Sequence, residues 1–235
     1  ILVDEARTPL IISGPLDDTV PANRPISLRD LLTCRMGFGL IAEPSAAYPI
    51  QKALDEAGLA PGPNPPPLEP DAWMKRLGAL PLMHQPGERW MYHTGFDVLC
   101  VLLARATGQP LETFLRERLF EPLGMKDTGF SVPEPKLDRL ATCYRTDTTT
   151  GGLALFDEAR GGAYSRPPRF PSELVSTADD YLAFGQMLLN HGRHGRERIL
   201  SRPSVELMTT DQLTPAQRAG GEMILGADPP AGRRG

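Results

Sequence analysis

Residues Gln85 to Pro133 constrain the fold of this 235-residue chain more than any other segment. A Pro-Gly turn and a Trp-x-Tyr pair open the segment, and an almost entirely apolar run follows from Phe96 to Ala106. A run that is apolar on nearly all sides and is followed by Gly108 predicts a buried central helix. A second helix is predicted to begin with Pro110 at its first position, and its apolar face consists of Leu111, Phe114, Leu115 and Leu119.

Shorter patterns outside this segment predict further helices and one hairpin. Helix-capping patterns start at Ser27 with Asp30, at Asp71, at Ser176 to Asp179, and at Ser201 with Pro203. Residues 140–144 and 153–156 flank a Thr-Thr-Thr-Gly-Gly turn and predict a β-hairpin. Residues 58–70 are rich in proline and predict a connector.

Charge and composition argue against several classes of partner. The net charge of −4 gives no electrostatic reason to expect nucleic acid or an anionic membrane surface as a partner. No apolar run approaches the roughly 18 residues that a membrane-spanning helix needs. Because residues 1–3 are too short for the apolar part of a secretory signal and acidic residues follow directly, a cytoplasmic location is expected.

The residue types that bind metals form no recognisable site. Cys34, Cys100 and Cys143 are far apart among apolar neighbours and are interpreted as reduced core thiols. The four histidines, at positions 84, 93, 191 and 194, form no His-Glu-x-x-His motif or His/Cys cluster. The sequence therefore predicts neither a metal nor another cofactor.

The order of motifs in residues 85–133 resembles the tyrosine-bearing segment of the serine hydrolases related to class C β-lactamases, penicillin-binding proteins and esterases. LDDTVPANRPISLRDLLTCRMGFG at residues 16–39 resembles the segment after the nucleophile helix in the same family. The resemblance covers roughly residues 16–218. It implies an α+β fold of the β-lactamase/penicillin-binding-protein type, mostly the helical lobe with a small hairpin and an incomplete central antiparallel sheet. The implied chemistry is acyl transfer through a serine-bound acyl-enzyme, without a metal.

The nucleophile motif of that family, Ser-x-x-Lys, does not occur in these residues. Acyl transfer uses a serine with a lysine one helical turn later, because the amine takes or holds the proton of the hydroxyl. The chain has four lysines, at positions 52, 75, 126 and 136, and the residues three positions earlier are Pro49, Ala72, Leu123 and Pro133. No nucleophile is therefore assigned, and the chain as it stands is predicted to be inactive.

Tyr92 occupies the position of the family's catalytic tyrosine, which implies a role in proton relay. Thr94 stands where the family has Asn or Ser and is the implied substrate contact. A phenol needs a nearby cation to lower its pKa from about 10, and without the motif lysine Tyr92 would lack one. The triplet from His93 to Gly95 spells a third family motif, His-x-Gly, but it precedes a predicted helix and is interpreted as a coincidence.

Residues 1–15, ILVDEARTPLIISGP, resemble the Walker B segment of the SecA preprotein-translocase motor. That resemblance implies a Mg²⁺ ligand at Asp4 and a water-polarising residue at Glu5. The chain has no Gly-x-x-x-x-Gly-Lys-[Ser/Thr] phosphate loop, so a translocase ATPase fragment is only a remote alternative. Residues 1–15 are interpreted as a scar or fusion, residues 16–218 as a partial hydrolase domain, and residues 219–235 as an irregular tail produced by a frameshift or truncation.

Two functional interpretations follow. The first is a serine hydrolase, carboxylesterase or β-lactamase-like, acting on a small-molecule ester or a β-lactam-like substrate. The second is a non-catalytic remnant or binding fragment of that family. If strands are lacking, the apolar surface of the helices is left without a cover and predicts self-association.

Overall fold

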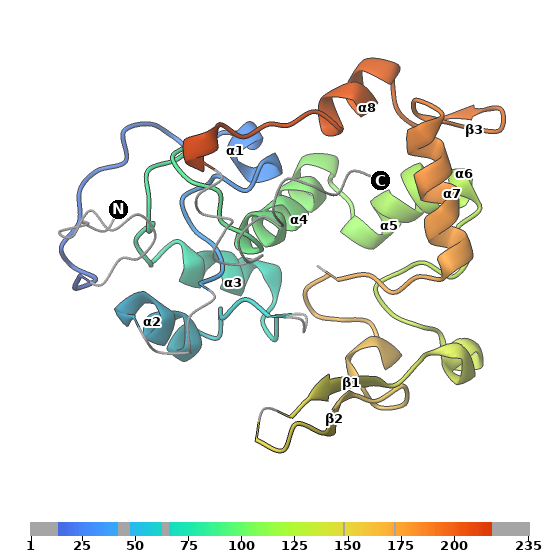
Figure 1. The fold of residues 1–235 in the computed structure, drawn as a ribbon, viewed down its shortest axis with the longest axis horizontal. Coiled ribbons are helices and arrows are strands. Elements are labelled where there is room, and N and C mark those ends of the chain that lie inside the picture. The colour runs from blue at the N-terminus through green and yellow to red at the C-terminus, as the bar shows by residue number, and fades with distance from the viewer. Residues whose placement is uncertain (1–13, 42–47, 63–65, 148, 172, 218–235) are drawn as a thin grey trace. The chain divides into compact units, whose positions relative to one another are not determined.

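The computed structural model describes residues 14–41, 48–62, 66–147, 149–171 and 173–217 (Figure 1). Contacts between residues divide the chain into two compact units. Among the described residues, those within 14–62, 66–102 and 211–217 form the first unit, and those within 103–210 form the second. The predicted scar, apart from residues 14 and 15, and the predicted irregular tail lie outside the described residues.

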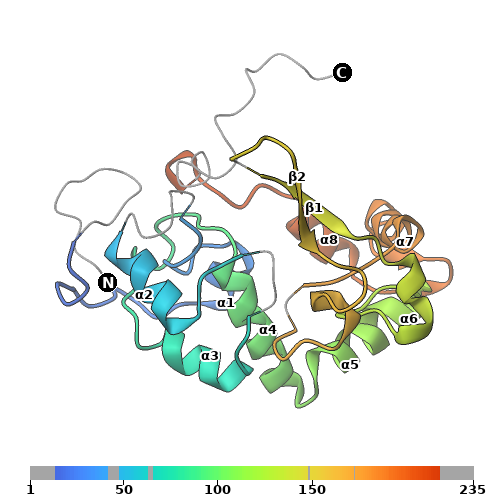
Figure 2. The same ribbon diagram turned by 90° about the horizontal axis from the view of Figure 1, so that it is seen from below.

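The first unit contains short helices and most of one long helix, all labelled in Figure 2. These are α1 (Leu28–Leu32), α2 (Pro49–Ala57), α3 (Pro70–Leu77) and α4 (Thr94–Thr107), of which α4 continues into the second unit from Leu103. The largest side chains buried in this unit are Phe38, Ile50 and Trp73. Arg76 on α3 donates to the carbonyl of Ala57 at the end of α2 over 2.7 Å, which joins these two neighbouring helices.

Of the two helix starts predicted in this unit, one is confirmed and the other was wrong. The capping box of α1 is confirmed: the amide of Asp30 donates to the side chain of Ser27, and the carboxylate of Asp30 accepts from the amide of Ser27. The prediction that Asp71 caps α3 was wrong. Glu69 is the N-cap and Pro70 is the first helical residue. Proline suits this position because it has no backbone N–H, and an N–H there would have no partner within the helix.

The predicted central helix exists as α4, but its burial was overestimated. Phe96 and Leu102 are 43% and 39% exposed. Asp97 and Val101, one turn apart, are buried together with the first two residues of the helix. Residues four positions apart share a helix face, so α4 packs through one face, although its sequence is apolar on most sides.

The second unit contains the remaining elements. They are α5 (Leu111–Leu115), the π-helical turn η1 (Arg116–Phe120), α6 (Glu121–Leu123), the 3₁₀ turns η2 (Glu134–Arg139) and η3 (Ala163–Ser165), the strands β1 (Cys143–Thr146), β2 (Leu153–Asp157), β3 (Arg193–His194) and β4 (Glu197–Arg198), and the helices α7 (Ala178–Leu189) and α8 (Arg202–Met208). Pro110 is the N-cap of α5 and not its first residue. The helix widens at η1 just before Pro122, whose ring cannot donate a backbone hydrogen bond and clashes with the carbonyl four residues earlier.

The core of the second unit lies between the end of α6 and α7, which are neighbours in Figures 1 and 2. It is formed by Phe120, Leu123, Met125 and Met187. The predicted cap of α7 is confirmed, with Thr177 as the N-cap whose side chain accepts from the amide of Asp180. Oδ2 of Asp180 accepts from the backbone amide of Asp127 and from the hydroxyl of Thr128. These two hydrogen bonds fix the loop after α6 to α7.

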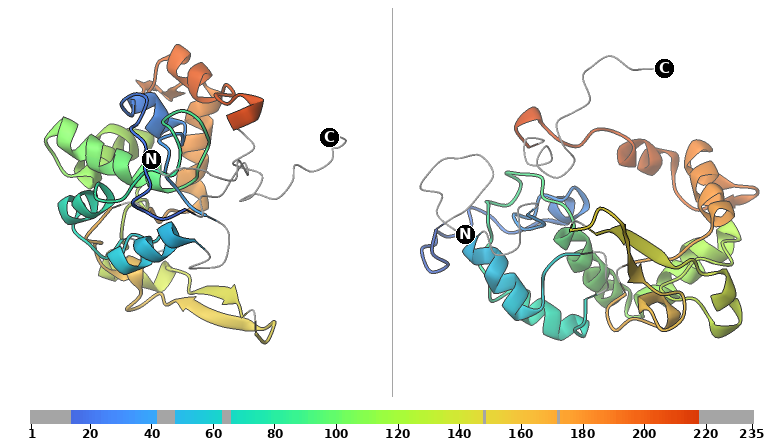
Figure 3. Two further views of the ribbon diagram at one scale, coloured as in Figure 1. Left: turned by 90° about the vertical axis from the view of Figure 1, so that its left-hand side faces the viewer. Right: turned by 60° about the horizontal axis from the view of Figure 1, so that its bottom comes forward.

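The predicted hairpin is confirmed as an antiparallel pair of β1 and β2, visible in both panels of Figure 3. Tyr144 pairs with Leu155 and Thr146 pairs with Leu153, and the register shifts next to Cys143. The loop of residues 193–198 forms a second, smaller antiparallel pair, β3 and β4. The described residues therefore form an α+β structure that is mainly helical and has two small antiparallel sheets.

The interpretation of all three cysteines as core thiols was only partly correct. None of the three forms a disulfide, but only Cys34 is buried, whereas Cys143 is exposed on β1. Burial raises the pKa of the Cys34 thiol to about 11, since the thiolate is poorly solvated there. No helix within the described parts of the chain is long and apolar enough to cross a membrane.

Candidate active site around Tyr92

The residues before Tyr92 are extended, and their side chains alternate between two sides. Arg89 and Met91 are turned inward, with 17% exposure of the Arg89 side chain and 8% exposure of Met91. Trp90 and Tyr92 lie on the other side, since successive side chains of an extended segment point in opposite directions. Arg89 lies 3.9 Å from the carboxylate of Glu88 and is largely buried.

The irregular segment from Cys34 to Leu40, which turns at Cys34 and Gly37, contacts the Tyr92 segment through its backbone. The amide of Met91 donates to the carbonyl of Cys34 over 2.7 Å, and the amide of Leu40 donates to the carbonyl of Tyr92 over 2.8 Å. Gly39 is required at this point, because a Cβ atom there would lie 2.6 Å from the carbonyl oxygen of Tyr92. The segment of residues 34–40 thus holds the backbone before and at Tyr92, in a close approach that only glycine at position 39 permits.

A charge pair between the exposed Arg24 and the buried Asp30 lies against the turn that leads into the Tyr92 segment. The guanidinium of Arg24 donates to both carboxylate oxygens of Asp30, over 2.6 and 2.9 Å, and the side chain of Ser27 donates to the same carboxylate. The Asp30 side chain is 3% exposed. These donors, of which the Arg24 guanidinium contributes most, hold the pKa of Asp30 far below its usual range. Gly87 lies directly against the guanidinium of Arg24, where a Cβ atom would clash.

Gln217 fixes the same turn from a distant part of the sequence. Its side-chain amide donates to the carbonyl of Gly87 over 2.7 Å, and its backbone carbonyl accepts from the amide of Trp90 over 3.2 Å. The segment before Tyr92 is therefore fastened to three other parts of the first unit, at residues 24–30, 34–40 and 217.

The ring of Tyr92 lies among other rings. It stacks on Trp90 with centroids 6.0 Å apart, and it meets Phe96 and His93 edge-on at 6.5 and 5.9 Å. Tyr92 is 43% exposed, and its hydroxyl makes no hydrogen bond to any residue that the structure describes. The arrangement presents a phenol on a packed aromatic surface, with its hydroxyl available to another molecule.

The structure places Thr94 differently from Tyr92. Thr94 is the first residue of α4 and is 2% exposed, so its hydroxyl is not at the surface that presents the Tyr92 ring. The triplet from His93 to Gly95 runs into this helix and does not lie on a strand.

The sequence analysis did not identify Asp97 as a member of this site. Asp97 is buried, and its carboxylate lies 3.2 Å from Nδ1 of His93, four residues earlier. The spacing could have revealed the pair, because residues four positions apart at a helix start face each other. The Arg24–Asp30 pair was also missed, since only the capping function of Asp30 is visible in the local sequence.

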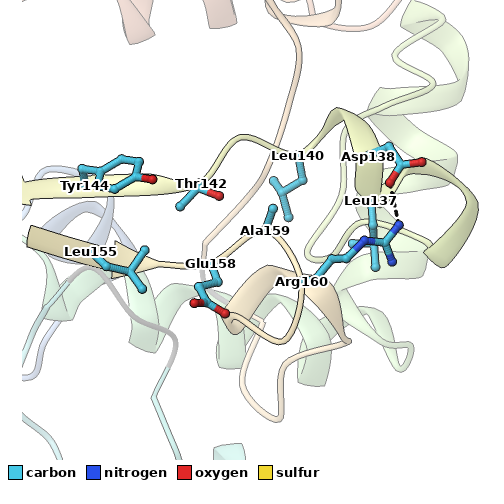
Figure 4. A pocket seen from close by; sticks show the side chains of 9 residues that line it. All are labelled: Leu137, Asp138, Leu140, Thr142, Tyr144, Leu155, Glu158, Ala159 and Arg160. Carbon is cyan, nitrogen blue, oxygen red and sulfur yellow. Dashed lines mark hydrogen bonds and ion pairs between the residues drawn. The ribbon is translucent and has the colours of Figure 1, made fainter.

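A separate recess of about 540 Å³ lies in the second unit, next to the β1–β2 hairpin (Figure 4). Apolar side chains of the hairpin and of η2 line it together with polar ones, among them Tyr144 and Glu158, and Arg160 pairs with Asp138 over 2.6 Å and with Glu134 over 2.9 Å. The guanidinium is thus paired with two carboxylates. Within the described ranges, no group of three or more His, Cys, Asp or Glu side chains is arranged to hold a metal ion.

Taken with the helical fold and its small antiparallel sheets, the tyrosine segment defines a protein of the β-lactamase and penicillin-binding-protein fold class. Residues 9–230 match the protein-family model described as Beta-lactamase, and the chain belongs to this family. It is 41% identical over 211 residues to the protein Rv1367c of Mycobacterium tuberculosis, which covers 88% of this chain and 49% of that protein. It is 32% identical over 150 residues to esterase EstB of Burkholderia gladioli, which covers 59% of this chain and 36% of that protein.

Solved structures of similar fold include an engineered form of simvastatin synthase (LovD) from Aspergillus terreus. It superposes with a TM-score of 0.62 at 25% identity over 86% of this chain and 44% of the other. EstCE1, a hydrolase with promiscuous acyltransferase activity, superposes with a TM-score of 0.61 at 24% identity over 83% and 52%, respectively, which shows the fold alone. The chain spans about half the length of the curated relatives that it matches over most of its own length.

The family match begins at residue 9 and so includes part of the segment in which the sequence resembles SecA. The comparisons give no support to the SecA resemblance, and the assignment of residues 1–15 to a translocase motor is withdrawn. The proposed roles of Asp4 and Glu5 lie outside the described residues and are withdrawn with it.

Proposed function

We propose that these residues form the tyrosine-bearing part of an acyl-transfer site for small-molecule esters, with β-lactam-like amides as the second substrate class. The observation that carries the proposal is the exposed phenol of Tyr92, held on a packed aromatic surface at the position of the family's catalytic tyrosine. Some relatives of this chain are named as esterases, and this is the reason for placing esters before amides as the proposed substrate class.

In this proposal the hydroxyl of Tyr92 relays a proton between a serine nucleophile and the leaving group. Its backbone is fixed by Cys34 to Leu40, so that the phenol needs little reorganisation when an ester approaches. Thr94 contributes as the first residue of α4, directly after the Tyr92 segment, and its buried hydroxyl makes no contact with substrate in this proposal. These 235 residues contain no Ser-x-x-Lys, so the chain as it stands is proposed to turn over neither substrate class.

The rival proposal is a non-catalytic fragment that binds ligands of the same class. Hydrolysis of p-nitrophenyl butyrate and of benzylpenicillin by the purified chain tests the proposed inactivity, and turnover of either substrate would exclude the rival, with Tyr92→Phe as the test variant. Tyr181→Phe is the matched control, because Tyr181 is 69% exposed and lies on α7 in the second unit. Removal of a serine nucleophile costs about 10⁶-fold in rate, so we expect no turnover above the uncatalysed rate. Turnover that Tyr92→Phe abolishes and Tyr181→Phe leaves unchanged would overturn the proposed inactivity and identify Tyr92 as catalytic.

Self-association stays a prediction. Several large apolar side chains of the second unit are more than half exposed, among them Leu182 and Leu189 on α7 and Met208 on α8. Sedimentation over a range of concentrations tests it, and a monomer at every concentration would contradict it.

A further inference from the structure

His93 has a backbone conformation that histidine rarely adopts. Its φ angle is +84°, in the left-handed region that favours glycine and strains other residues. The conformation allows the chain to change from the extended Tyr92 segment to α4 within one residue, which leaves Tyr92 exposed and Thr94 buried. Glycine at this position would make the turn without strain, so the side chain of His93 calls for an explanation.

Both nitrogens of the His93 ring face acceptors. Nε2 lies 2.9 Å from the carbonyl oxygen of Gly62, which is 31 residues away in the sequence. Nδ1 lies 3.2 Å from Oδ2 of Asp97, within ion-pair distance although not aligned as a hydrogen bond. The side chains of His93 and Asp97 are 14% and 7% exposed. The ring is therefore held between the connector before α3 and the first turn of α4.

These two contacts determine the protonation state that suits the ring. The carbonyl of Gly62 can only accept, so Nε2 must carry a hydrogen. A lone pair on Nδ1 would face the buried carboxylate of Asp97 and be repelled by it, whereas an N–H there is attracted. A buried carboxylate is also costly without a cationic or donor partner. The geometry thus favours a doubly protonated imidazolium.

The imidazolium lies directly beside Tyr92. The two ring centroids are 5.9 Å apart and the ring planes are perpendicular, at 89°. The family's motif lysine does not occur in these 235 residues. His93 therefore provides a positive charge close to the phenol, at a distance where unit charges in a partly buried environment still interact appreciably. The charge of Asp97 reduces this field without cancelling it, because the carboxylate contacts the ring of His93 and not that of Tyr92.

We infer that His93, clamped between Gly62 and Asp97, is a positioning residue that fixes the direction of the Tyr92 ring and provides the positive charge beside it. This inference rests on the proposed role of Tyr92 in acyl transfer. It assigns to His93 the structural and electrostatic part of that role, and it assigns no contact between His93 and substrate.

The test measures Tyr92 directly and needs no catalytic activity. The chain is labelled with ¹³Cζ-tyrosine, the Tyr92 signal is assigned by its loss in Tyr92→Phe, and the chemical shift is followed from pH 5 to pH 9. The described contacts of the His93 ring include the carboxylate of Asp97 on α4, the phenol of Tyr92 and the neutral carbonyl of Gly62 in the connector. We expect the Tyr92 shift to step at the pH where the His93 ring loses its proton, and we expect no such step for the exposed Tyr144 on β1.

Three variants make the result specific. His93→Gln is expected to abolish the step. His191→Gln is the matched control and is expected to preserve it, since His191 also has a positive φ, of +51°, but lies in the second unit. Asp97→Asn keeps the shape of the side chain and is expected to move the step to lower pH, because the imidazolium then loses its anionic partner; this variant also serves if His93→Gln fails to fold.

Any one of three results would overturn the inference. The Tyr92 shift could show no step in the wild-type chain, the step could persist in His93→Gln, or Asp97→Asn could leave the step at the same pH. The proposed acyl-transfer function would survive any of these results, because it is tested separately by ester turnover in Tyr92→Phe.

Discussion

The Tyr92 segment and the β1–β2 hairpin are both extended structures, but different interactions hold them. The two strands of the hairpin pair with each other, and Tyr144, Leu153 and Leu155 on them are all exposed. The Tyr92 segment is fastened to residues 24–30, 34–40 and 217, which are distant in sequence. Local pairing thus suffices to form an exposed ribbon, whereas presenting one side chain in a fixed position takes contacts from several parts of the chain. Functional residues are commonly placed on such rigid supports.

The largest effect is expected from adding one methyl group where the two backbones approach. In Gly39→Ala the new Cβ would meet the carbonyl of Tyr92, which cannot move away without breaking its hydrogen bond to Leu40. We expect a loss of about 3 kcal/mol in the free energy of unfolding. Gly152→Ala in the hairpin is the control, since its Cβ would lie 3.4 Å from a movable side chain, and it should cost less than about 0.5 kcal/mol. Urea denaturation measures both, and equal losses would remove the distinction between the two regions.

A smaller effect is expected from the charge pair that anchors the turn before Tyr92. Asp30→Asn removes the carboxylate that accepts both Arg24 bonds, and we expect a loss of about 2–3 kcal/mol. Asp138→Asn breaks the exposed pair with Arg160 beside the hairpin and should cost less than about 1 kcal/mol. The comparison of the two unfolding midpoints would contradict the account if Asp138→Asn proved the more damaging.

Acid should remove the advantage that Asp30 gives. Its pKa in the folded chain lies below the value of about 3.9 in an unfolded chain. The stabilisation is therefore complete above about pH 4 and is lost as the pH falls through the pKa of the folded state. Because Lys136 and Arg139 also lower the pKa of Asp127, the wild-type curve alone reports both groups. The difference in unfolding free energy between wild type and Asp30→Asn isolates Asp30, and we expect that difference to shrink below about pH 4. A difference independent of pH would show that Asp30 acts only through its shape.

The sequence predicted the elements that depend on local patterns. The capping box at Ser27, the cap of α7 and the hairpin all follow from neighbouring residues, and the structure confirms them. The order of motifs around Tyr92 predicts its role, and that role stays a prediction.

The rest depends on contacts that no local pattern records. Three such contacts were not predicted. They are the packing of α4 through one face, the pairing of Arg24 with Asp30 and the approach of Gly39 to Tyr92. Of the two contacts of the His93 ring, the one with Asp97 could be predicted from the four-residue spacing. The one with the carbonyl of Gly62 could not be predicted, because it joins residues 31 positions apart. The wrong cap for α3 had a local cause, since Pro70 occupies the first helical position and moves the cap to Glu69.

Native-state hydrogen exchange tests the rigid presentation of Tyr92 most directly. The amide of Met91 donates to Cys34 over 2.7 Å, and the amide of Asp147 in the hairpin donates to Gly152 over 2.8 Å, so the two hydrogen bonds have nearly equal lengths. Met91 is buried and fastened by distant contacts, whereas the hairpin can open locally. We expect the amide of Met91 to exchange at least about 100-fold more slowly than that of Asp147, relative to their intrinsic rates. Equal protection of the two amides would contradict the claim that Tyr92 is held on a rigid support.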